Sequence, residues 1–165
     1  MTKAKILDLH NIQAVLLDLD DTIITDNGLS EKTWRSACDK YAPLVGSLSG
    51  EELYAAVRQV TVSFWSDPEN HRRGRLNLKA ARRYIVSQAF ANLGLENSRV
   101  AQDLADTFTA EKEQSITLMP GALKTLQYLK DCGLALGLIT NGAGEMQRWK
   151  IEKFGLAPFF DCILI

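Results

Sequence analysis

Three aspartates and a threonine follow the first apolar run of the chain at close spacing. Residues 14–17 read Ala-Val-Leu-Leu, and Asp18, Asp20, Asp21 and Thr22 come directly after them. A short apolar run bounded by polar residues predicts a strand that is buried on both faces of a parallel sheet. Because ligands bind at the carboxyl ends of such strands, we interpret these carboxylates as a site.

The spacing of Asp18 and Asp20 suits a divalent cation. Side chains two residues apart share one side of an extended chain, so the two carboxylates lie together if the extended conformation continues through Leu19. Two such charges repel each other unless a cation lies between them, and oxygen ligands suit Mg²⁺. The simpler alternative is a turn and a helix cap, with the carboxylates solvated.

A second apolar run ends in polar residues of another kind. Residues 134–139 predict a second buried strand, and Thr140, Asn141 and Gly142 follow it. If the two strand ends are neighbours, the carboxylates face a hydroxyl and the backbone N–H groups of a helix start, which together suit a phosphate. A carboxylate beside Mg²⁺ and phosphate can attack phosphorus, and a second carboxylate can protonate the leaving oxygen.

The elements around these motifs predict an α/β protein with an inserted helical module. Four helices without a strand are expected over residues 30–41, 51–64, 76–93 and 98–113. Ser30, Ser49 and Asn97 or Ser98 are the expected N-caps, and Ser49 with Glu52 fits a capping box. Further on, helices alternate with strands, which predicts a parallel sheet with right-handed crossovers.

Composition and charge favour a soluble globular protein. The chain has 165 residues, of which 46% are hydrophobic and 24% charged, and its net charge of −1 offers no general attraction to nucleic acid or to an anionic membrane. We find no signal peptide and no apolar run of membrane-spanning length, so we expect a cytoplasmic protein. Cys38, Cys132 and Cys162 form no metal-binding or redox motif and are expected to be reduced core thiols.

The two motifs resemble those of the haloacid dehalogenase-like (HAD) hydrolase superfamily. Residues 18–24 are similar to its first motif and residues 138–142 to its second, with a sub-pattern similar to the N-acylneuraminate-9-phosphatase-like members of the phosphatase branch. The resemblance implies a Rossmann-like parallel sheet core over residues 1–28 and 114–165, incomplete at its C-terminus. It also implies an all-helical cap domain over residues 29–113.

The resemblance further implies a role for each site residue. Asp18 would be the nucleophile and a Mg²⁺ ligand, and Asp20 would be the general acid/base and a second Mg²⁺ ligand through its backbone carbonyl. Thr140 would hold the transferring phosphoryl group, with Asn141 assisting. The implied activity is a Mg²⁺-dependent phosphomonoesterase that acts on a small phosphorylated metabolite through an aspartyl-phosphate, with neither nucleic acid nor membrane as a partner.

Arg72 and Arg73 belong to a basic run over residues 71–75. They are candidate substrate residues, because a basic segment of a cap can steer an anionic substrate toward a site. A solvated basic loop is the simpler interpretation of the same residues. Five other conspicuous side chains are expected to be structural: Asp21, Trp34, Phe64, Trp65 and Asp161.

The family pattern also implies a lysine and an acidic pair that would fall beyond Ile165. Lys150 is the nearest lysine, and its place well along a helix predicts a surface residue. The chain therefore resembles a shortened hydrolase in which catalysis is impaired.

Two alternatives stay open: a non-catalytic remnant, and a receiver-like phosphoacceptor domain, which the helical insert and the acidic cluster on one strand disfavour. Neither the substrate nor the oligomeric state is indicated.

Overall fold

A computed structural model describes residues 11–165, which divide into two compact units. The core unit comprises residues 11–24, 118–141 and 145–165. The helical unit comprises residues 25–117 and 142–144. The expected cap, residues 29–113, begins and ends four residues inside the helical unit, and the role of that unit as a cap stays a prediction.

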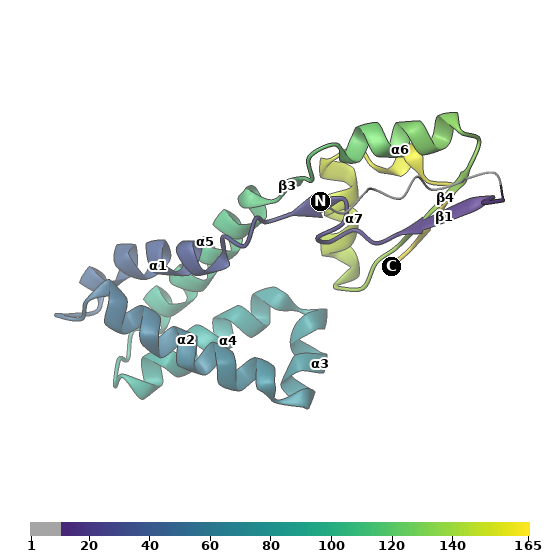
Figure 1. Ribbon diagram of the computed structural model, residues 1–165. Helices are drawn as coiled ribbons and strands as arrows, with labels where there is room; N and C mark the ends of the chain where they lie inside the picture. The colour runs from purple at the N-terminus through teal and green to yellow at the C-terminus, as the bar shows by residue number, and fades with distance from the viewer. Residues whose placement is uncertain (1–10) are drawn as a thin grey trace, which may run out of the picture. The chain divides into compact units, whose positions relative to one another are not determined.

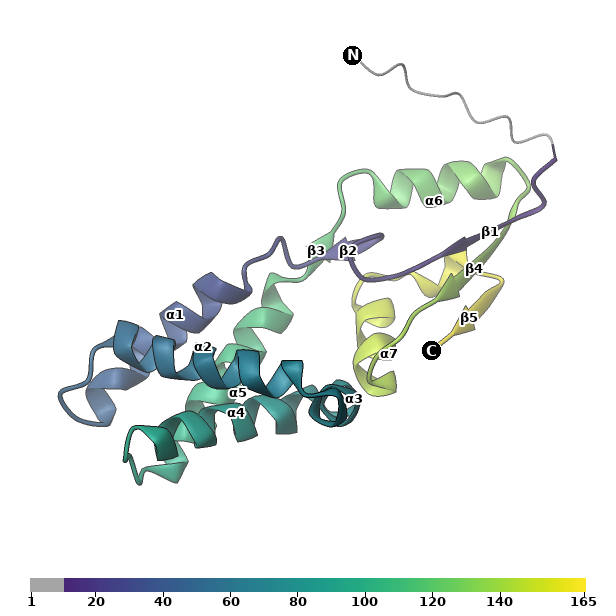
Figure 2. The ribbon, with the colours of Figure 1, turned by 60° about the horizontal axis from the view of Figure 1, so that its bottom comes forward.

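The core unit is built on a three-stranded parallel sheet in the order β1-β4-β5. Its strands are β1 (Ala14–Leu17), β4 (Ala135–Ile139) and β5 (Cys162–Leu164). Helix α6 (Ala122–Asp131) precedes β4, and α7 (Gly144–Lys153) and the 3₁₀ helix η2 (Ala157–Phe159) connect β4 to β5 (Figure 1, Figure 2). The α/β class and the parallel sheet are thereby confirmed.

One face of this sheet carries the core. The strands follow one another in chain order across the sheet, so right-handed crossovers place α6 and α7 on the same face. On that face Leu136 and Leu138 of β4 are 1% and 0% exposed. The helical side contributes the buried side chains of Leu126, Ile151 and Leu156.

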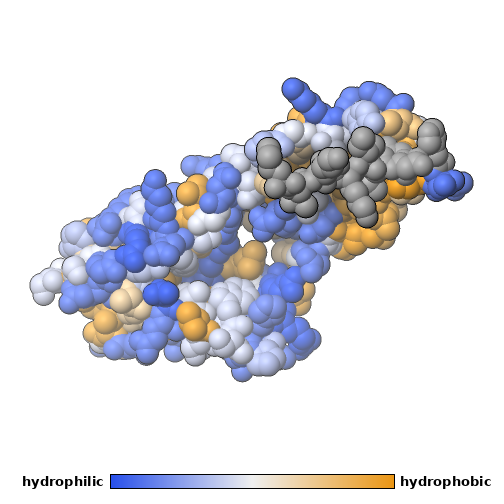
Figure 3. Space-filling view, viewed as in Figure 1, coloured by the Kyte–Doolittle hydropathy of each residue, from blue (hydrophilic) through white to orange (hydrophobic). Residues whose placement is uncertain are grey.

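The other face of the sheet is open, and the prediction that β1 is buried on both faces is wrong. Leu16, Ile139 and Leu164 are 68%, 45% and 56% exposed. Leu16 pairs with Gly137 and Ile139 pairs with Leu164, so the register places these side chains on one face. The reason is that both crossover helices lie on the opposite face. Figure 3 shows hydrophobic surface in the region of these strands.

A second, two-stranded sheet pairs β2 (Ile24–Thr25) with β3 (Thr117–Leu118). The division between the two units falls inside both of these strands. The chain therefore leaves the core unit along β2 and returns to it along β3. On the core side, the backbone N–H of Met119 donates to the carbonyl of Ile23 at 2.8 Å.

The helical unit contains five α-helices and one 3₁₀ helix among the residues that the structure describes. They are α1 (Ser30–Tyr41), η1 (Ala42–Leu44), α2 (Gly50–Ser66), α3 (Pro68–Leu76), α4 (Leu78–Asn92) and α5 (Ser98–Ser115) (Figure 1). The sequence predicts four of the α-helices. The fifth, α3, covers residues 71–75, so the interpretation of this basic run as a loop is wrong. Asp67 explains the helix, because its carboxylate caps the N–H of Asn70 at 2.7 Å, directly before Pro68.

Two of the three predicted caps are confirmed. Ser49 and Glu52 form the capping box, in which the Glu52 carboxylate accepts from the Ser49 N–H at 2.9 Å. The side chain of Asn97 caps α5. The N-cap of α1 is Leu29 rather than Ser30, which is the first helical residue.

The core of the helical unit is aromatic. Trp34 stacks on Phe108 with a centroid distance of 3.6 Å, and Trp34 and Phe64 are 9% and 8% exposed. Trp65 packs edge-on against Phe64 at 5.0 Å. Gly74 allows α3 to approach these rings, since a Cβ atom at this position would lie 2.9 Å from the Phe64 ring. The three predicted core aromatics are therefore structural.

The cysteines behave differently from one another. Cys38 is buried as predicted, and burial raises the pKa of its thiol to about 12. Cys132 and Cys162 are exposed, so the prediction of core thiols is wrong for both. Cys162 lies on the open face of the sheet, whose exposure the sequence does not reveal.

Among residues 11–165, no helix combines the length and the apolar character that crossing a membrane requires.

Candidate active site

The two predicted motifs lie at the same edge of the core sheet. Leu17, the last residue of β1, pairs with Leu138 of β4, so Asp18 and Thr140 follow the carboxyl ends of neighbouring parallel strands. The backbone N–H of Thr140 donates to the carbonyl of Leu164 at 3.0 Å, which ties the end of β4 to β5. The expectation that these two strand ends are neighbours is confirmed.

A tight turn follows β1 and shapes the position of Asp20. The chain bends at Leu19, whose side chain is buried and whose carbonyl accepts from the N–H groups of Ile23 and Ile24 at 2.9 and 3.1 Å. Asp21 has a φ of 57°, and its N–H donates to the Ile24 carbonyl at 2.7 Å. Asp21 is thus a turn residue, as predicted. The bend replaces the extended conformation on which the shared side of Asp18 and Asp20 depends.

Gln147 connects the two halves of the predicted site. This α7 residue is 2% exposed, and its Nε2 lies 2.9 Å from Oδ2 of Asp20 and 2.6 Å from Oγ1 of Thr140. One amide group therefore holds a side chain from the β1 turn and another from the end of β4. Gln147 is not among the site residues expected from the sequence. Its spacing of four residues from Ile151, which faces the sheet, is the signal that places it on the buried side of α7.

Lys150 also belongs to this cluster, and the prediction that it is a surface residue is wrong. Its Nζ donates to Oδ1 of Asp20 at 2.7 Å, and its side chain is 12% exposed. The spacing of three residues explains the finding, because Gln147 and Lys150 lie on the same side of α7. We call the four residues Asp20, Thr140, Gln147 and Lys150 the Asp20 cluster.

Asp18 and Asp20 are the carboxylates available for a divalent cation, and both residues are exposed. Within residues 11–165, no three or more Asp, Glu, His or Cys side chains gather into a metal-binding group. Mg²⁺ is commonly bound by one or two carboxylates, with water and substrate phosphate as its other ligands. The Asp18 carboxylate and the backbone carbonyl of Asp20 are oxygen donors of the kind that suits Mg²⁺, with water and substrate phosphate as further ligands.

The hydroxyl of Thr140 lies inside the Asp20 cluster, whereas Asn141 lies at its rim. Thr140 is 6% exposed, and the backbone carbonyl of Asn141 lies 3.5 Å from Nε2 of Gln147. The side chain of Asn141 belongs to an exposed residue. Residues 142–144 group with the helical unit, and the anion-binding role of the Gly142 and Ala143 amides stays a prediction.

Arg72 and Arg73 lie on α3 in the helical unit and are exposed. Arg72 pairs with Glu69 of the same helix at 2.9 Å. An exposed pair three residues apart on a helix has a sufficient local explanation. A substrate-binding role for the two arginines therefore stays a prediction.

Asp161 is structural, as expected. Its carboxylate accepts from the backbone N–H of Leu136 at 2.8 Å and from Nζ of Lys130 at 3.1 Å. These contacts, the backbone hydrogen bond first, hold the pKa of Asp161 below its usual value. The carboxylate thereby fixes the start of β5 against β4.

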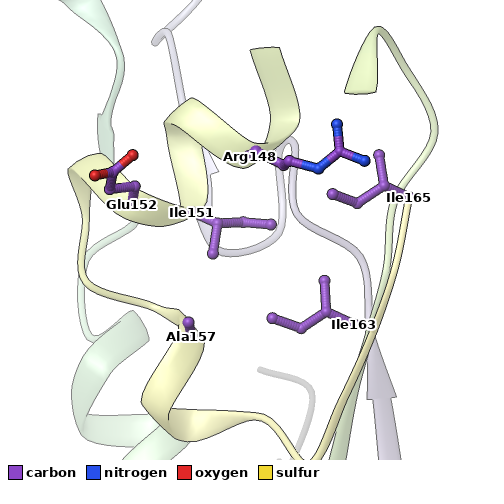
Figure 4. Close-up of a pocket in the computed structure, with 6 residues that line it drawn as sticks. All are labelled: Arg148, Ile151, Glu152, Ala157, Ile163 and Ile165. Carbon is purple, nitrogen blue, oxygen red and sulfur yellow. The ribbon is translucent and has the colours of Figure 1, made fainter. Parts of the chain in front are cut away.

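A hollow of about 450 Å³ lies elsewhere in the core unit, between α7 and β5 (Figure 4). Its lining is mainly apolar, with Ile151, Ile163 and Ile165 facing it and Arg148 and Glu152 at its margin. None of the residues that line it belongs to the Asp20 cluster. The chemistry of the candidate site therefore does not involve this hollow.

The chain matches the haloacid dehalogenase-like hydrolase family over residues 12–165. The glyceraldehyde 3-phosphate phosphatase of Methanopyrus kandleri is 28% identical over 156 residues, which cover 93% of this chain and 61% of that protein. The phosphoserine phosphatase of Thermus thermophilus is 29% identical over 171 residues, covering 93% of this chain and 68% of that protein. The chain thus spans about three fifths of the length of the first of these relatives.

A solved structure shows the same fold. The magnesium-bound HAD-hydrolase YfnB of Bacillus subtilis aligns with a TM-score of 0.54 at 21% identity, over 92% of this chain and 62% of that one. The structural likeness agrees with the family match, which extends over almost the whole chain. The chain therefore belongs to the haloacid dehalogenase-like hydrolase family.

Proposed function

We propose that this chain carries the site of a Mg²⁺-dependent phosphomonoesterase that works through an aspartyl-phosphate. The observation that supports the proposal most directly is the bridge made by Gln147, which holds Asp20 and Thr140 at 2.9 and 2.6 Å from one nitrogen. The two side chains for which we propose acid/base and phosphate-binding roles are thereby held together, and Asp18 follows the end of the neighbouring strand. Such preorganisation is what phosphoryl transfer requires.

The proposed reaction has two steps. In the first, a carboxylate oxygen of Asp18 attacks phosphorus, the bond from phosphorus to the alcohol oxygen breaks, and Asp20 gives its proton to that oxygen. In the second, Asp20 removes a proton from a water molecule, whose oxygen attacks the same phosphorus. The bond to Asp18 breaks, and inorganic phosphate and the free carboxylate are formed.

The other residues of the site bind rather than transfer protons. The Thr140 hydroxyl and the Asn141 side chain hold the non-reacting phosphate oxygens, and Gln147 keeps Asp20 and Thr140 in place. When bound by Asp18 and Asp20, Mg²⁺ would neutralise the negative charge that carboxylate and phosphate bring together.

The substrate class proposed is a small phosphorylated metabolite, with neither nucleic acid nor a membrane as a partner and with the cytoplasm as the location. Support comes from relatives named for glyceraldehyde 3-phosphate and phosphoserine, both small phosphate monoesters. The net charge of −1 also provides no general attraction to polyanions.

Hydrolysis of p-nitrophenyl phosphate, with and without Mg²⁺, tests the proposal. Asp18→Asn is expected to abolish the Mg²⁺-dependent activity, a loss of about a thousandfold or more. Asp21→Asn is the matched control. It makes the same chemical change three residues away, in a left-handed turn that asparagine tolerates, and is expected to keep the activity. Activity that survives in Asp18→Asn overturns the mechanism.

The same assay separates the two alternatives. A receiver-like phosphoacceptor would retain a phosphoryl group on Asp18 without turning over. A non-catalytic remnant would take up no phosphoryl group and hydrolyse nothing. Glyceraldehyde 3-phosphate and phosphoserine, offered in parallel, show whether either relative's substrate is accepted.

A further inference from the structure

The ammonium group of Lys150 already neutralises Asp20 in the absence of a divalent cation. Its Nζ lies 2.7 Å from Oδ1 of Asp20, and the Lys150 side chain is 12% exposed, compared with 46% for Asp20. A charge withdrawn this far from water needs a partner of opposite sign. Burying the Lys150 ammonium group without a partner would cost free energy, so the group stays next to the Asp20 carboxylate.

Both oxygens of Asp20 have protein donors. Oδ1 accepts from Lys150 at 2.7 Å, and Oδ2 accepts from Gln147 at 2.9 Å. Gln147 is neutral and does not oppose a cation, whereas Lys150 carries the same sign of charge as Mg²⁺. Of the two α7 side chains, Lys150 alone therefore disfavours a divalent cation beside the Asp20 carboxylate.

We propose that Lys150 is a tethered counter-ion that competes with Mg²⁺ for the negative charge of Asp20. It holds Asp20 in place while the site is free of metal and lowers the affinity of the site for the divalent cation. The identity of the cation rests on the proposed function, whereas the ion pair is independent of it. A lysine suits such a role, because its flexible stem lets the ammonium group withdraw when the cation binds.

The first test is calorimetric titration of the 165-residue chain with Mg²⁺ at physiological salt. Lys150→Met is expected to bind Mg²⁺ more tightly, by about fivefold or more, which is the usual lower range for two coupled binding events. Lys153→Met is the matched control: it removes the same charge from the same helix at a side chain that lies over the Trp149 ring. Its affinity for Mg²⁺ is expected to change by less than about twofold, because salt screens a more distant charge.

The second test needs no metal. Urea unfolding of wild type, Asp20→Asn, Lys150→Met and the double variant measures whether the two side chains stabilise each other. Non-additive losses, with the double variant less destabilised than the sum of the single variants, are expected. Additive losses overturn the proposal. Lys150→Arg, which keeps the charge, is expected to retain the stability and not to tighten Mg²⁺ binding.

The outcomes distinguish this proposal from the proposed function. An unchanged or weaker Mg²⁺ affinity in Lys150→Met overturns the competition alone, provided that hydrolysis still depends on Asp18. Absence of Mg²⁺ binding in all variants overturns both the competition and the Mg²⁺ requirement. If the wild-type chain hydrolyses no substrate but Lys150→Met binds Mg²⁺ more tightly than wild type, only the enzymatic function is overturned.

Discussion

Replacing Gln147 by leucine removes the bridge between Asp20 and Thr140 while keeping much of the side-chain volume. Thr140 is 6% exposed, and its hydroxyl would lose its 2.6 Å partner at a largely buried position. Leaving such a group unsatisfied costs about 1–3 kcal/mol. The side chain of Asp20 is 46% exposed, so water replaces most of its lost contact. The expected loss in the free energy of unfolding is therefore about 1–3 kcal/mol, mostly from Thr140.

Hydrogen exchange read by mass spectrometry on peptides that cover β4 measures this loss in the core unit alone. Gln127→Leu is the matched control, since Gln127 and its partner Asp131 are both exposed on α6. Its effect is expected to stay within about 0.5 kcal/mol. Thr140→Val in the Gln147→Leu background removes the orphaned hydroxyl and is expected to recover part of the stability. Equal effects of the two glutamine substitutions would refute the bridging role.

Three further predictions concern the rest of the chain. Gly74→Ala is expected to lower the unfolding free energy of the helical unit by about 1–3 kcal/mol in urea, because the added Cβ lies 2.9 Å from the Phe64 ring; an unchanged midpoint contradicts this. The hydrogen bond from Arg83 lowers the pKa of Asp106, so the stabilisation is present at neutral pH and is lost as pH falls through the folded-state pKa. Asp106→Asn should therefore cost about 0.2–1 kcal/mol at pH 7 and progressively less below about pH 4, and an equal cost at both pH values speaks against the pair. Ellman's reagent should modify the two exposed thiols of the native protein and spare Cys38, whose thiol is buried with a pKa of about 12; rapid reaction of all three is the opposing result.

The parts of the fold that depend on periodic patterns and caps were predictable. Residues 134–139 predicted β4 because apolar residues continue without alternation, and the capping box at Ser49 marked the start of α2 to within one residue. The neighbouring strand ends followed from the rule that parallel strands meet at one edge, which brought Asp18 and Thr140 together. Local sequence carries this information directly.

The parts that depend on tertiary placement were not predictable in the same way. The exposure of Leu16 follows from the single covered face of the sheet, which no local pattern of β1 reports. Lys150 looks like any polar residue of a helix, and only the rotation of α7 against the sheet brings it to Asp20. The short helix α3 escapes prediction because proline and glycine disfavour helix interiors, although here Pro68 begins the helix and Gly74 allows its close packing.

The central claim is that Asp18 becomes phosphorylated during turnover, and chemical trapping tests it most directly. The protein is mixed with p-nitrophenyl phosphate and Mg²⁺, quenched in acid, and digested, and its peptides are read by mass spectrometry. A phosphoryl group is expected on the peptide that contains Asp18. It should accumulate in Asp20→Asn, where hydrolysis of the intermediate lacks its base, and be absent from Asp18→Asn. Steady hydrolysis without that label, or with the label on another residue, would contradict the account.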